Sequence, residues 1–240
     1  MSALLTIEGV VAGYGRGDIL HGVDLTLEDG SVTCLVGPNG AGKSTVLKTL
    51  SGLLRPRAGR ILLDGKDICH LSPAQVLERG VVHVAQERSL FPLMTVWDNL
   101  LMGGHILRDR MLVRQRADAI AARFELVRDR RNERAGALSG GQQKLIEIAR
   151  ALMLEPRLIL LDEPTMGLDP KARHLIFEMV SELNGEGRTV LLVEQNARAG
   201  LAIADYGAVL DGGRVALKGH GSSLLEDPRV AELYLGGAPA

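Results

Sequence analysis

The stretch Gly37-Pro38-Asn39-Gly40-Ala41-Gly42-Lys43-Ser44-Thr45 carries the most specific pattern in this sequence. It fits G-x-x-x-x-G-K-[ST], in which glycines let backbone N–H groups curl around phosphate oxygens. The apolar run 31–36 before it predicts a strand, and residues 43–54 after it have the apolar spacing of a helix that Pro56 ends. All nine residues are therefore predicted to bind a nucleotide. Lys43 would reach the β- and γ-phosphates and Ser44 would ligate Mg²⁺; the alternative is a glycine-rich turn without a ligand.

An apolar run that ends in two acids, Leu158-Ile159-Leu160-Leu161-Asp162-Glu163, is the second informative stretch. In open α/β sheets, ligands bind at the carboxyl ends of the strands. Asp162 is predicted to hold Mg²⁺ directly or through water, and Glu163 to polarise the attacking water as general base. The alternative is a loop that merely carries two acids.

A third stretch, Leu138-Ser139-Gly140-Gly141-Gln142, precedes residues 141–154, where the apolar spacing predicts a helix. Ser139 is a plausible N-cap, and the two glycines expose the backbone, so this is a second helix start suited to an anion. One phosphate loop already serves one nucleotide. The second helix start therefore suggests a site that two chains complete together.

The rest of the chain alternates strand and helix patterns, which predicts an α/β fold in a single domain, residues 1–240. Residues of about 92–137 have almost no strand signal and predict a helical insertion. Its Arg-rich part, 108–134, alternates with acids and indicates a solvated helical face rather than a nucleic-acid site. Strands are expected at 4–9, 23–27, 31–36, 60–63, 81–85, 158–162, 189–193, 208–210 and 214–217.

Composition excludes several classes of protein. The chain has 240 residues, 46% of them hydrophobic, and a net charge of −1, so it is not disordered and has no overall basic field for nucleic acid. Cys34 and Cys69 are far apart, which argues against a disulfide or zinc site and suits a reducing cytosol. We expect no signal peptide and no membrane span, so that any role at a membrane depends on partners. The six histidines have no metal-ligand spacing and are expected to be structural.

Together with Gln86 and Gly167-Leu168-Asp169-Pro170, the three stretches stand in the order of an ATP-binding cassette (ABC) transporter ATPase, which the whole chain resembles. The resemblance implies a P-loop NTPase fold: a mixed sheet with an antiparallel β subdomain and a helical subdomain. It also implies a head-to-tail dimer, in which each ATP lies between the phosphate loop of one subunit and Ser139, Gly140, Gly141 and Gln142 of the other. In that family Tyr14 would stack on adenine, Gln86 would sense Mg²⁺ and couple to the membrane subunit, and Asp169 would communicate across the dimer.

Finer features resemble the ATPases of branched-chain amino acid importers. They include 12–15, 90–96, 99–103, 193–196 and 234–237. Gln195 stands where most of the family has a histidine, and the subfamily shares this glutamine, so Gln195 is a candidate catalytic residue. The subfamily often has Glu in place of Gln86, which leaves open whether Gln86 or Glu87 faces the metal.

These features predict an ATP-hydrolysing subunit of an importer for branched-chain or related amino acids, peripheral on the cytoplasmic face of the plasma (inner) membrane. Its partners would be a second ABC ATPase subunit, transmembrane permease subunits contacted through 91–102, and indirectly a solute-binding protein, with no nucleic acid. Urea and short-chain amide importers remain alternatives. So does a non-transport ABC ATPase, although the chain has neither a long coiled-coil insertion nor a second cassette. A small-molecule kinase would not need the 138–142 stretch.

Overall fold

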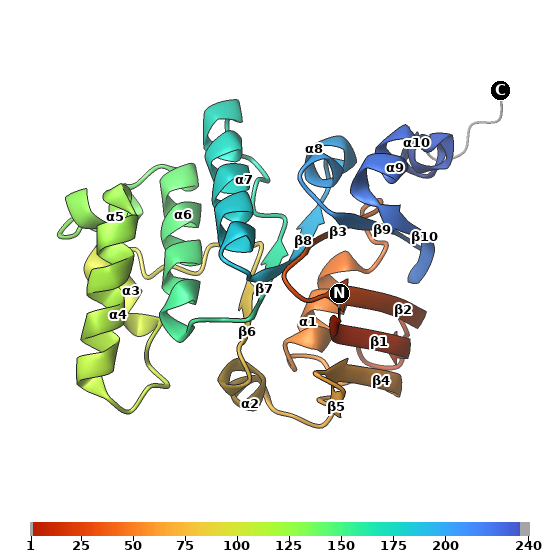
Figure 1. Cartoon of the computed structure of the whole chain (residues 1–240), viewed down its shortest axis with the longest axis horizontal. Helices are drawn as coiled ribbons and strands as arrows, with labels where there is room; N and C mark the ends of the chain where they lie inside the picture. Colours follow the sequence, from red (N-terminus) through yellow and green to blue (C-terminus); the bar gives the residue numbers. More distant parts are fainter. Residues whose placement is uncertain (1, 236–240) are drawn as a thin grey trace.

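Two β-sheets and a group of helices at one end make up the computed structural model, which describes residues 2–235 with side chains as far as Leu233. The larger sheet has six strands in the order β10-β9-β3-β8-β7-β6, and the smaller has four in the order β2-β1-β4-β5 (Figure 1). The strands are β1 (Ala3–Ala12), β2 (Leu20–Glu28), β3 (Val32–Val36), β4 (Ala58–Leu63), β5 (Lys66–Asp67), β6 (Val81–Val84), β7 (Leu158–Asp162), β8 (Thr189–Glu194), β9 (Tyr206–Asp211) and β10 (Arg214–His220).

The centre of the larger sheet is parallel and buried on both faces. β3, β7 and β8 are buried at every position, and successive side chains point to opposite faces. Ile159 and Leu161 of β7 therefore pack with the helices, whereas Leu158 and Leu160 pack toward the smaller sheet. Because β9 and β10 form an antiparallel hairpin with a turn at residues 211–214, the six-stranded sheet is mixed. The predicted fold class is confirmed.

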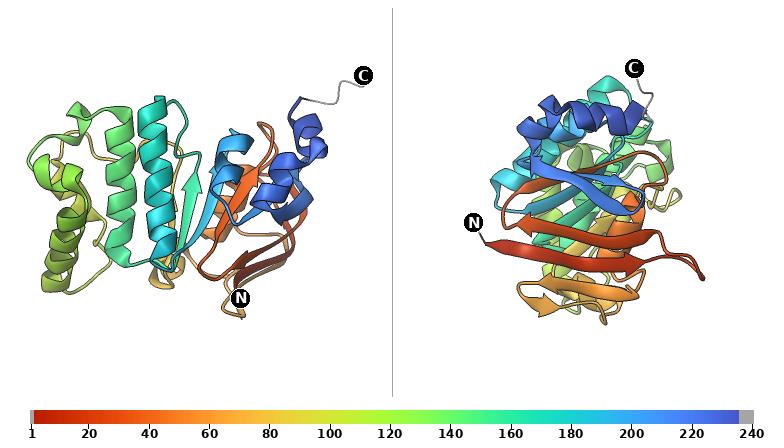
Figure 2. Two further views of the ribbon diagram at one scale, coloured as in Figure 1. Left: turned by 45° about the horizontal axis from the view of Figure 1, so that its top comes forward. Right: turned by 90° about the vertical axis from the view of Figure 1, so that its right-hand side faces the viewer.

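The smaller sheet is antiparallel, and one helix fills the space behind it. Helix α1 (Lys43–Leu50) buries Val46, Leu47 and Leu50 in the core shared with β1, β2 and β4. Figure 2 shows this sheet at the end of the molecule opposite the helical insertion. The phosphate loop thus starts from β3, at the centre of the larger sheet, and leads into a helix held between two sheets.

In Figure 1, α3 to α6 gather at one end of the larger sheet. Helices α7 to α10 contribute to the core on one face of that sheet, whereas α1 and α2 pack on the other face. Within the predicted insertion 92–137 lie α3, α4, α5 and the 3₁₀ helix η1. The remaining helices pack on the sheet or connect its strands. The bounds are α2 (Pro73–Glu78), α3 (Val96–Met102), α4 (Arg110–Arg123), α5 (Glu125–Asp129), η1 (Ala135–Ala137), α6 (Gly140–Ala151), η2 (Leu152–Leu154), α7 (Pro170–Gly185), α8 (Ala197–Ala202), α9 (Gly221–Glu226) and α10 (Pro228–Leu235).

Two predicted helix ends were wrong. α1 stops at Leu50, four residues before the predicted end, because the chain turns at Gly52 with a φ of +73°. The apolar pattern continues past the helix, but Leu53 is exposed. α6 begins one residue before the predicted start and ends at Ala151, where one 3₁₀ turn continues to Leu154.

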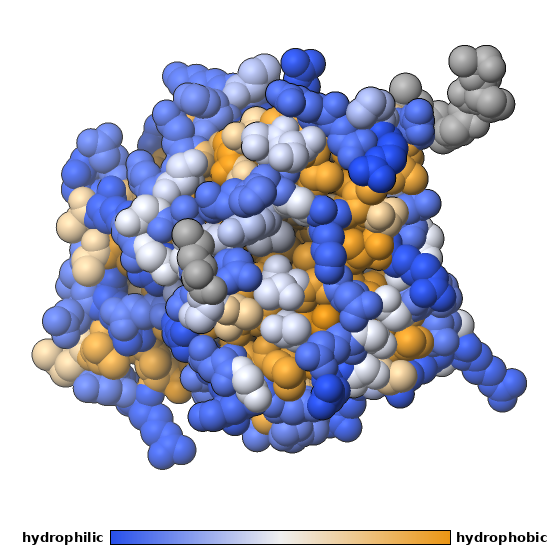
Figure 3. All heavy atoms as spheres, turned by 45° about the vertical axis from the view of Figure 1, so that its right-hand side comes forward, coloured by the Kyte–Doolittle hydropathy of each residue, from blue (hydrophilic) through white to orange (hydrophobic). Residues whose placement is uncertain are grey.

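Other sequence expectations can be compared with the structure directly. Cys34 is fully buried in β3, as its place in the apolar run 31–36 indicates. Most of the arginines between 108 and 134 are exposed, but Arg116 also donates to the Met153 carbonyl and so ties α4 to η2. No helix among residues 2–235 is long and apolar enough to cross a membrane. On the face shown in Figure 3, hydrophobic patches alternate with hydrophilic side chains. Gly236 and Gly237, part of the importer-like 234–237 segment, lie outside the described residues.

Candidate active site

The phosphate loop joins the end of β3 to the start of α1, and its backbone needs glycine at two places. Gly42 is the N-cap of α1 with a φ of +105°, and no side chain caps this helix. At Gly37, a Cβ atom would collide with the Leu210 carbonyl of β9. The loop therefore lies close to the sheet and leaves the N-terminal end of α1 without a capping side chain, which suits a phosphate group.

Lys43 is buried inside this loop, with 5% of its surface exposed. Its Nζ donates to the carbonyls of Gly37 at 2.8 Å and Pro38 at 3.2 Å, and it lies 3.6 Å from Glu163 Oε1. A buried ammonium is costly unless it is paired, and here carbonyls and a carboxylate provide the partners. The loop thus holds a positive charge ready for an anionic ligand.

Ser44 and Asp162 meet at the end of β7. Ser44 Oγ donates to Asp162 Oδ1 at 3.1 Å, across 118 positions of sequence. Burial is the main cause that raises the pKa of Asp162, and the neighbouring Glu163 adds to it, whereas the hydroxyl of Ser44 opposes the rise. A cation placed here would favour the ionised carboxylate.

Glu163 follows directly and has a left-handed backbone, with a φ of +44°. It is 8% exposed, and its Oε2 accepts a hydrogen bond of 3.1 Å from Gln86 Nε2. Non-glycine residues in this conformation are uncommon and are enriched at functional sites. Gln86 rather than Glu87 reaches the site, since Glu87 is exposed and Gln86 lies against the buried acid.

A pocket of about 410 Å³ lies between these groups. Gln195, at the end of β8, and Met166 complete its wall. Met166 contributes a sulfur 3.1 Å from Gln86 Nε2, a contact that the sequence did not indicate. The residues that line the pocket are Ile19, Asn39, Gly40, Gly42, Lys43, Ser44, Thr45, Gln86, Glu163, Met166 and Gln195.

The signature segment Leu138–Gln142 is not part of this wall. Ser139 is the predicted N-cap of α6: its Oγ accepts from Gln142 N, and the Gln142 side chain accepts from Ser139 N. Asp169 caps α7 by accepting from Lys171 N and Ala172 N, each at 3.0 Å. Within one chain, the structure therefore places these residues apart from the phosphate loop.

A family model for ABC transporters matches residues 20–166, which is more than half of the chain and contains the phosphate loop, the signature segment and both acids of β7. The chain belongs to the ABC transporter ATPases.

Similar proteins cover nearly the full length of this ATPase. The high-affinity branched-chain amino acid transport ATP-binding protein BraG of Pseudomonas aeruginosa is 39% identical over 98% of this chain and 100% of its own. The lipopolysaccharide export system ATP-binding protein LptB of Haemophilus influenzae is 34% identical, covering 98% of each chain. A crystal structure of an ABC transporter cassette in its ADP conformation aligns with a TM-score of 0.87 and 33% identity, over 98% of this chain and 100% of that one. The protein is thus an ATP-binding, ATP-hydrolysing cassette.

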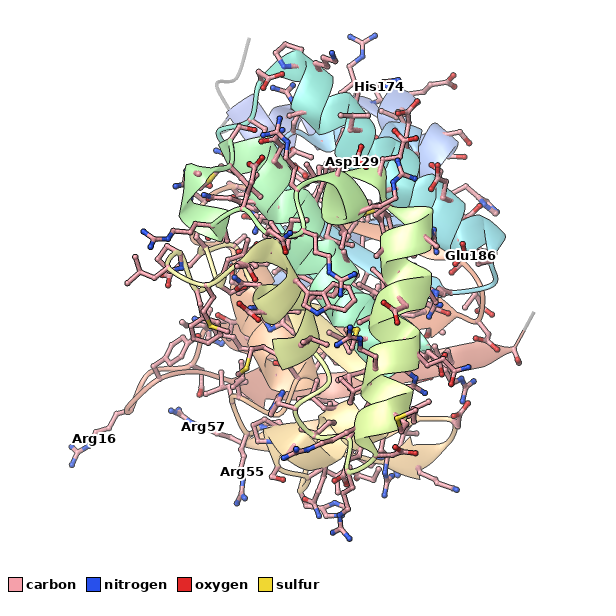
Figure 4. The ribbon with its side chains drawn as sticks, turned by 90° about the vertical axis from the view of Figure 1, so that its left-hand side faces the viewer. Arg16, Arg55, Arg57, Asp129, His174 and Glu186 are labelled. Atoms are coloured by element: carbon pink, nitrogen blue, oxygen red, sulfur yellow. The ribbon has the colours of Figure 1, made fainter. Side chains whose placement is uncertain are left out.

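Tyr14 lies in the loop between β1 and β2, half exposed, and it is not among the residues of the pocket wall. Its ring centroid is 5.7 Å from Lys48 Nζ on α1. Arg57 holds this loop by donating to the Gly15 carbonyl at 2.6 Å and to Asp18. Figure 4 shows Arg16 at the tip of the loop with Arg55 and Arg57 nearby along the same edge. Nothing in the sequence pattern had singled out Arg57.

Glu194 is a second residue that the motifs did not identify. It is buried at the end of β8, and its Oε1 accepts from Thr165 Oγ1 at 2.8 Å. Burial raises the pKa of Glu194 to about 7, and the charge of Glu163 contributes to the rise. In the sequence, Glu194 follows the apolar run 190–193 and lies inside the importer-like segment 193–196, but neither pattern indicated a role for its side chain.

A separate cleft of about 420 Å³ lies between β6, the segment after it, and α6. Phe91 and Met102 stand at this cleft, 46% and 40% exposed, and the fully buried Asn99 fixes Phe91 through hydrogen bonds to its N–H and carbonyl. Val96 and Leu100 are fully buried, so only part of 91–102 is available to a partner. His83 also lines the cleft. Its Nε2 is buried without a hydrogen bond to the described residues, and burial lowers the pKa of His83 to about 4.

Proposed function

We propose that this ATPase energises an importer of branched-chain or related amino acids. The observation that carries the enzymatic part is the meeting of Lys43, Ser44, Gln86, Glu163 and Gln195 around one pocket. Lys43 and Ser44 begin α1, and the other three residues follow the ends of β6, β7 and β8. Their side chains supply a cation, a hydroxyl, a base and two amides around one pocket, which is the set that phosphoryl transfer requires.

In this proposal each residue has one task. Lys43 and the backbone N–H groups of residues 40–45 bind the β- and γ-phosphates. Glu163 accepts the proton of the attacking water, and its hydrogen bond with Gln86 keeps the carboxylate oriented. Gln195 positions the water or the γ-phosphate through its amide, because it can donate and accept but cannot take up a proton.

The donors around Ser44 and Asp162 fit Mg²⁺. A hydroxyl and a buried carboxylate oxygen already 3.1 Å apart are hard oxygen ligands, and the amide of Gln86 is nearby at the same pocket. Ser44, Asp162 and Gln86 would hold the ion, which would neutralise charge on the phosphates. The hydrogen bond from Ser44 Oγ to Asp162 Oδ1 keeps these two proposed ligands next to each other.

A dimer would complete the site. The signature residues Ser139, Gly140, Gly141 and Gln142 do not line the phosphate-loop pocket of their own chain. Of the two glycines expected to expose the backbone, Gly140 is partly exposed, but Gly141 is buried against Ala172 of α7, where a Cβ atom would collide. We propose that they bind the nucleotide held by a second cassette, with Asp169 near the contact. ATP would favour the closed dimer and loss of the γ-phosphate would open it, which is a population shift driven by differential binding.

The cleft at Phe91 and Met102 is the proposed contact with a transmembrane permease, which would place the cassette on the cytoplasmic face of the membrane. An apolar helix from the permease would cover the two exposed side chains at this cleft, Phe91 and Met102. The relatives named for branched-chain amino acid transport support import. The relatives named for lipopolysaccharide export favour a second candidate, a cassette that serves an exporter.

Isolation of the cassette from its native membranes tests these two functions. The Glu163→Gln variant should retain ATP and so trap the assembled complex. The co-purified permease is then identified and reconstituted in vesicles with the unchanged cassette, which can hydrolyse ATP. Radiolabelled leucine should accumulate in these vesicles in an ATP-dependent way. Movement of a lipopolysaccharide probe instead, with no leucine uptake, would establish the export function and refute the import proposal.

A further inference from the structure

Helix α6 contacts the segment 85–89, here named the Gln86 loop, through three charged side chains spaced one turn apart. Lys144 Nζ donates to the carbonyl of Ala85 at 3.0 Å and contacts that of Gln86 at 3.5 Å. Lys144 also forms an ion pair of 2.6 Å with Glu147. The carbonyl groups on both sides of the Gln86 Cα thus contact Lys144 of α6. Lys144 lies two residues after the end of the signature segment.

The next two turns continue the attachment. Glu147 Oε1 accepts from Ser89 N, and Arg150 donates to the Ser89 carbonyl at 2.9 Å and to Ser89 Oγ. Lys144, Glu147 and Arg150 therefore bind both ends of the Gln86 loop, and we call these three side chains the α6 clamp. The loop makes these contacts across about 60 positions of sequence.

Burial makes the clamp unusual for a purely structural element. Lys144 is 8% exposed and Glu147 is 2% exposed, and a buried ion pair gives little net stability compared with apolar residues of similar size. Here, however, the charges point at backbone groups of a loop that carries an active-site side chain. Hydrogen bonds from these charged groups are directional, so they fix the position of the loop backbone. Apolar contacts are not directional and would fix it less well.

The clamp also lies between three proposed sites. At its N-terminal end α6 carries the signature segment, whereas Glu147, Arg150 and Ser89 line the cleft at Phe91. The Gln86 side chain, on the far side of the loop, contacts Glu163. A shift of α6 relative to the larger sheet would therefore move the Gln86 backbone with it.

We propose that Lys144, Glu147 and Arg150 are positioning residues that keep Gln86 at a fixed position relative to α6. Binding of the signature segment to the partner's nucleotide would then move Gln86 at the chain's own nucleotide. Binding of a partner in the cleft would act on Gln86 through the same three side chains. This inference rests on the proposed role of Gln86 and adds the residues that control it.

A double-mutant cycle on the purified full chain tests the proposal. Lys144→Met should lower kcat for ATP about 10- to 100-fold, the effect of a displaced positioning group, while KM for ATP changes less than about twofold. Gln86→Ala should lower kcat similarly. If the clamp acts through Gln86, Lys144→Met should cause little further loss in the Gln86→Ala background.

Two further variants keep the result interpretable. Glu147→Gln preserves the shape of the side chain and can still accept from Ser89 N, so this variant should fold even if Lys144→Met does not. Its kcat should fall because the ion pair with Lys144 is lost. Asp118→Asn, which removes an exposed carboxylate from the i,i+4 pair with Arg114 on α4, should leave kcat unchanged.

The failure of the clamp and the failure of the active-site proposal give different results. The clamp proposal alone would be overturned if the kcat losses of Lys144→Met and Gln86→Ala multiply in the double variant. It would also be overturned if a rise in KM for ATP accounts for the whole loss of activity in Lys144→Met. Full activity in Gln86→Ala would refute the role assigned to Gln86, and the inference would fall with it.

Discussion

Lys43 and Glu163 face each other in the pocket, yet replacing Lys43 should have different consequences from replacing Glu163. At 3.6 Å and an effective dielectric constant of about 20, their gross attraction is about 4–5 kcal/mol. Lys43→Met leaves Glu163 buried with only the Gln86 amide, and breaking a buried pair in this way costs about 3–5 kcal/mol. Glu163→Gln instead leaves Lys43 bonded to the Gly37 and Pro38 carbonyls. We therefore expect a cost in unfolding free energy of about 1 kcal/mol.

The two variants should differ in nucleotide binding as well. Each charge-assisted contact between Lys43 and a phosphate contributes about 1.5–3 kcal/mol, but Lys43 must first leave two carbonyls. With one contact to the β-phosphate and one to the γ-phosphate, the gross loss for Lys43→Met is about 3–6 kcal/mol. The net loss should lie near the lower end of that range, about 3 kcal/mol or roughly 150-fold in Kd. Glu163→Gln removes the base and a negative charge beside the phosphates. Binding should persist while turnover falls at least about 100-fold.

Titration with a fluorescent ATP analogue, phosphate release under saturating ATP and chemical unfolding without nucleotide measure the three quantities. Lys66→Met, a lysine on the exposed strand β5, is the matched control and should match the unchanged chain in all three. Equal loss of ATP binding in Lys43→Met and Glu163→Gln would refute the reasoning. It would show that Glu163 maintains the shape of the site rather than acting as its base.

Four other outcomes can be measured on the same chain. Gln195→Ala should lower turnover about 100-fold while ATP binding is largely kept, and Gln195→His should stay active. Unchanged turnover in Gln195→Ala would show that this residue is not part of the active site. Tyr14→Ala should weaken ATP binding by about 1–3 kcal/mol, the value of one stacked base, whereas Tyr14→Phe should not; equal affinity of the two variants would contradict stacking. Burial raises the pKa of Glu194 from its ordinary 4.5 to about 7, so the stability that this group contributes is complete below pH 4.5 and is lost as the pH rises through about 7. Urea unfolding of Glu194→Gln should therefore show an advantage over the unchanged chain that grows from pH 5 to pH 8, and a constant difference would argue against a buried acid. Burial lowers the pKa of His83 from 6.5 to about 4, so the stability that this group contributes is complete above pH 6.5 and is lost as the pH falls through about 4. In the same urea unfolding experiment, His83→Gln should remove this loss of stability at low pH.

Much of the fold could be predicted from the sequence because its signals are local. A wholly apolar run predicts a central parallel strand such as β7, and a serine with two glycines before an apolar periodicity predicts the start of α6. The phosphate loop is a single continuous segment, so its residues are neighbours in space by covalent connection. Helix ends were less reliable: the apolar spacing of 43–54 continues past Leu50, where a turn at Gly52 ends α1.

The tertiary structure alone decided which distant side chains meet. Gln86 reaches Glu163 across 77 positions and Ser44 reaches Asp162 across 118, and neither pairing follows from local periodicity. It also showed that Gln86, not Glu87, enters the pocket, and that Lys144 and Glu147 are buried at the Gln86 loop rather than solvated on a helix surface. Local sequence determines the conformation of each segment through backbone sterics and side-chain periodicity. The partners of a buried charge depend on how the sheets and helices pack, because only packing excludes water and brings the opposite charge within a few ångströms.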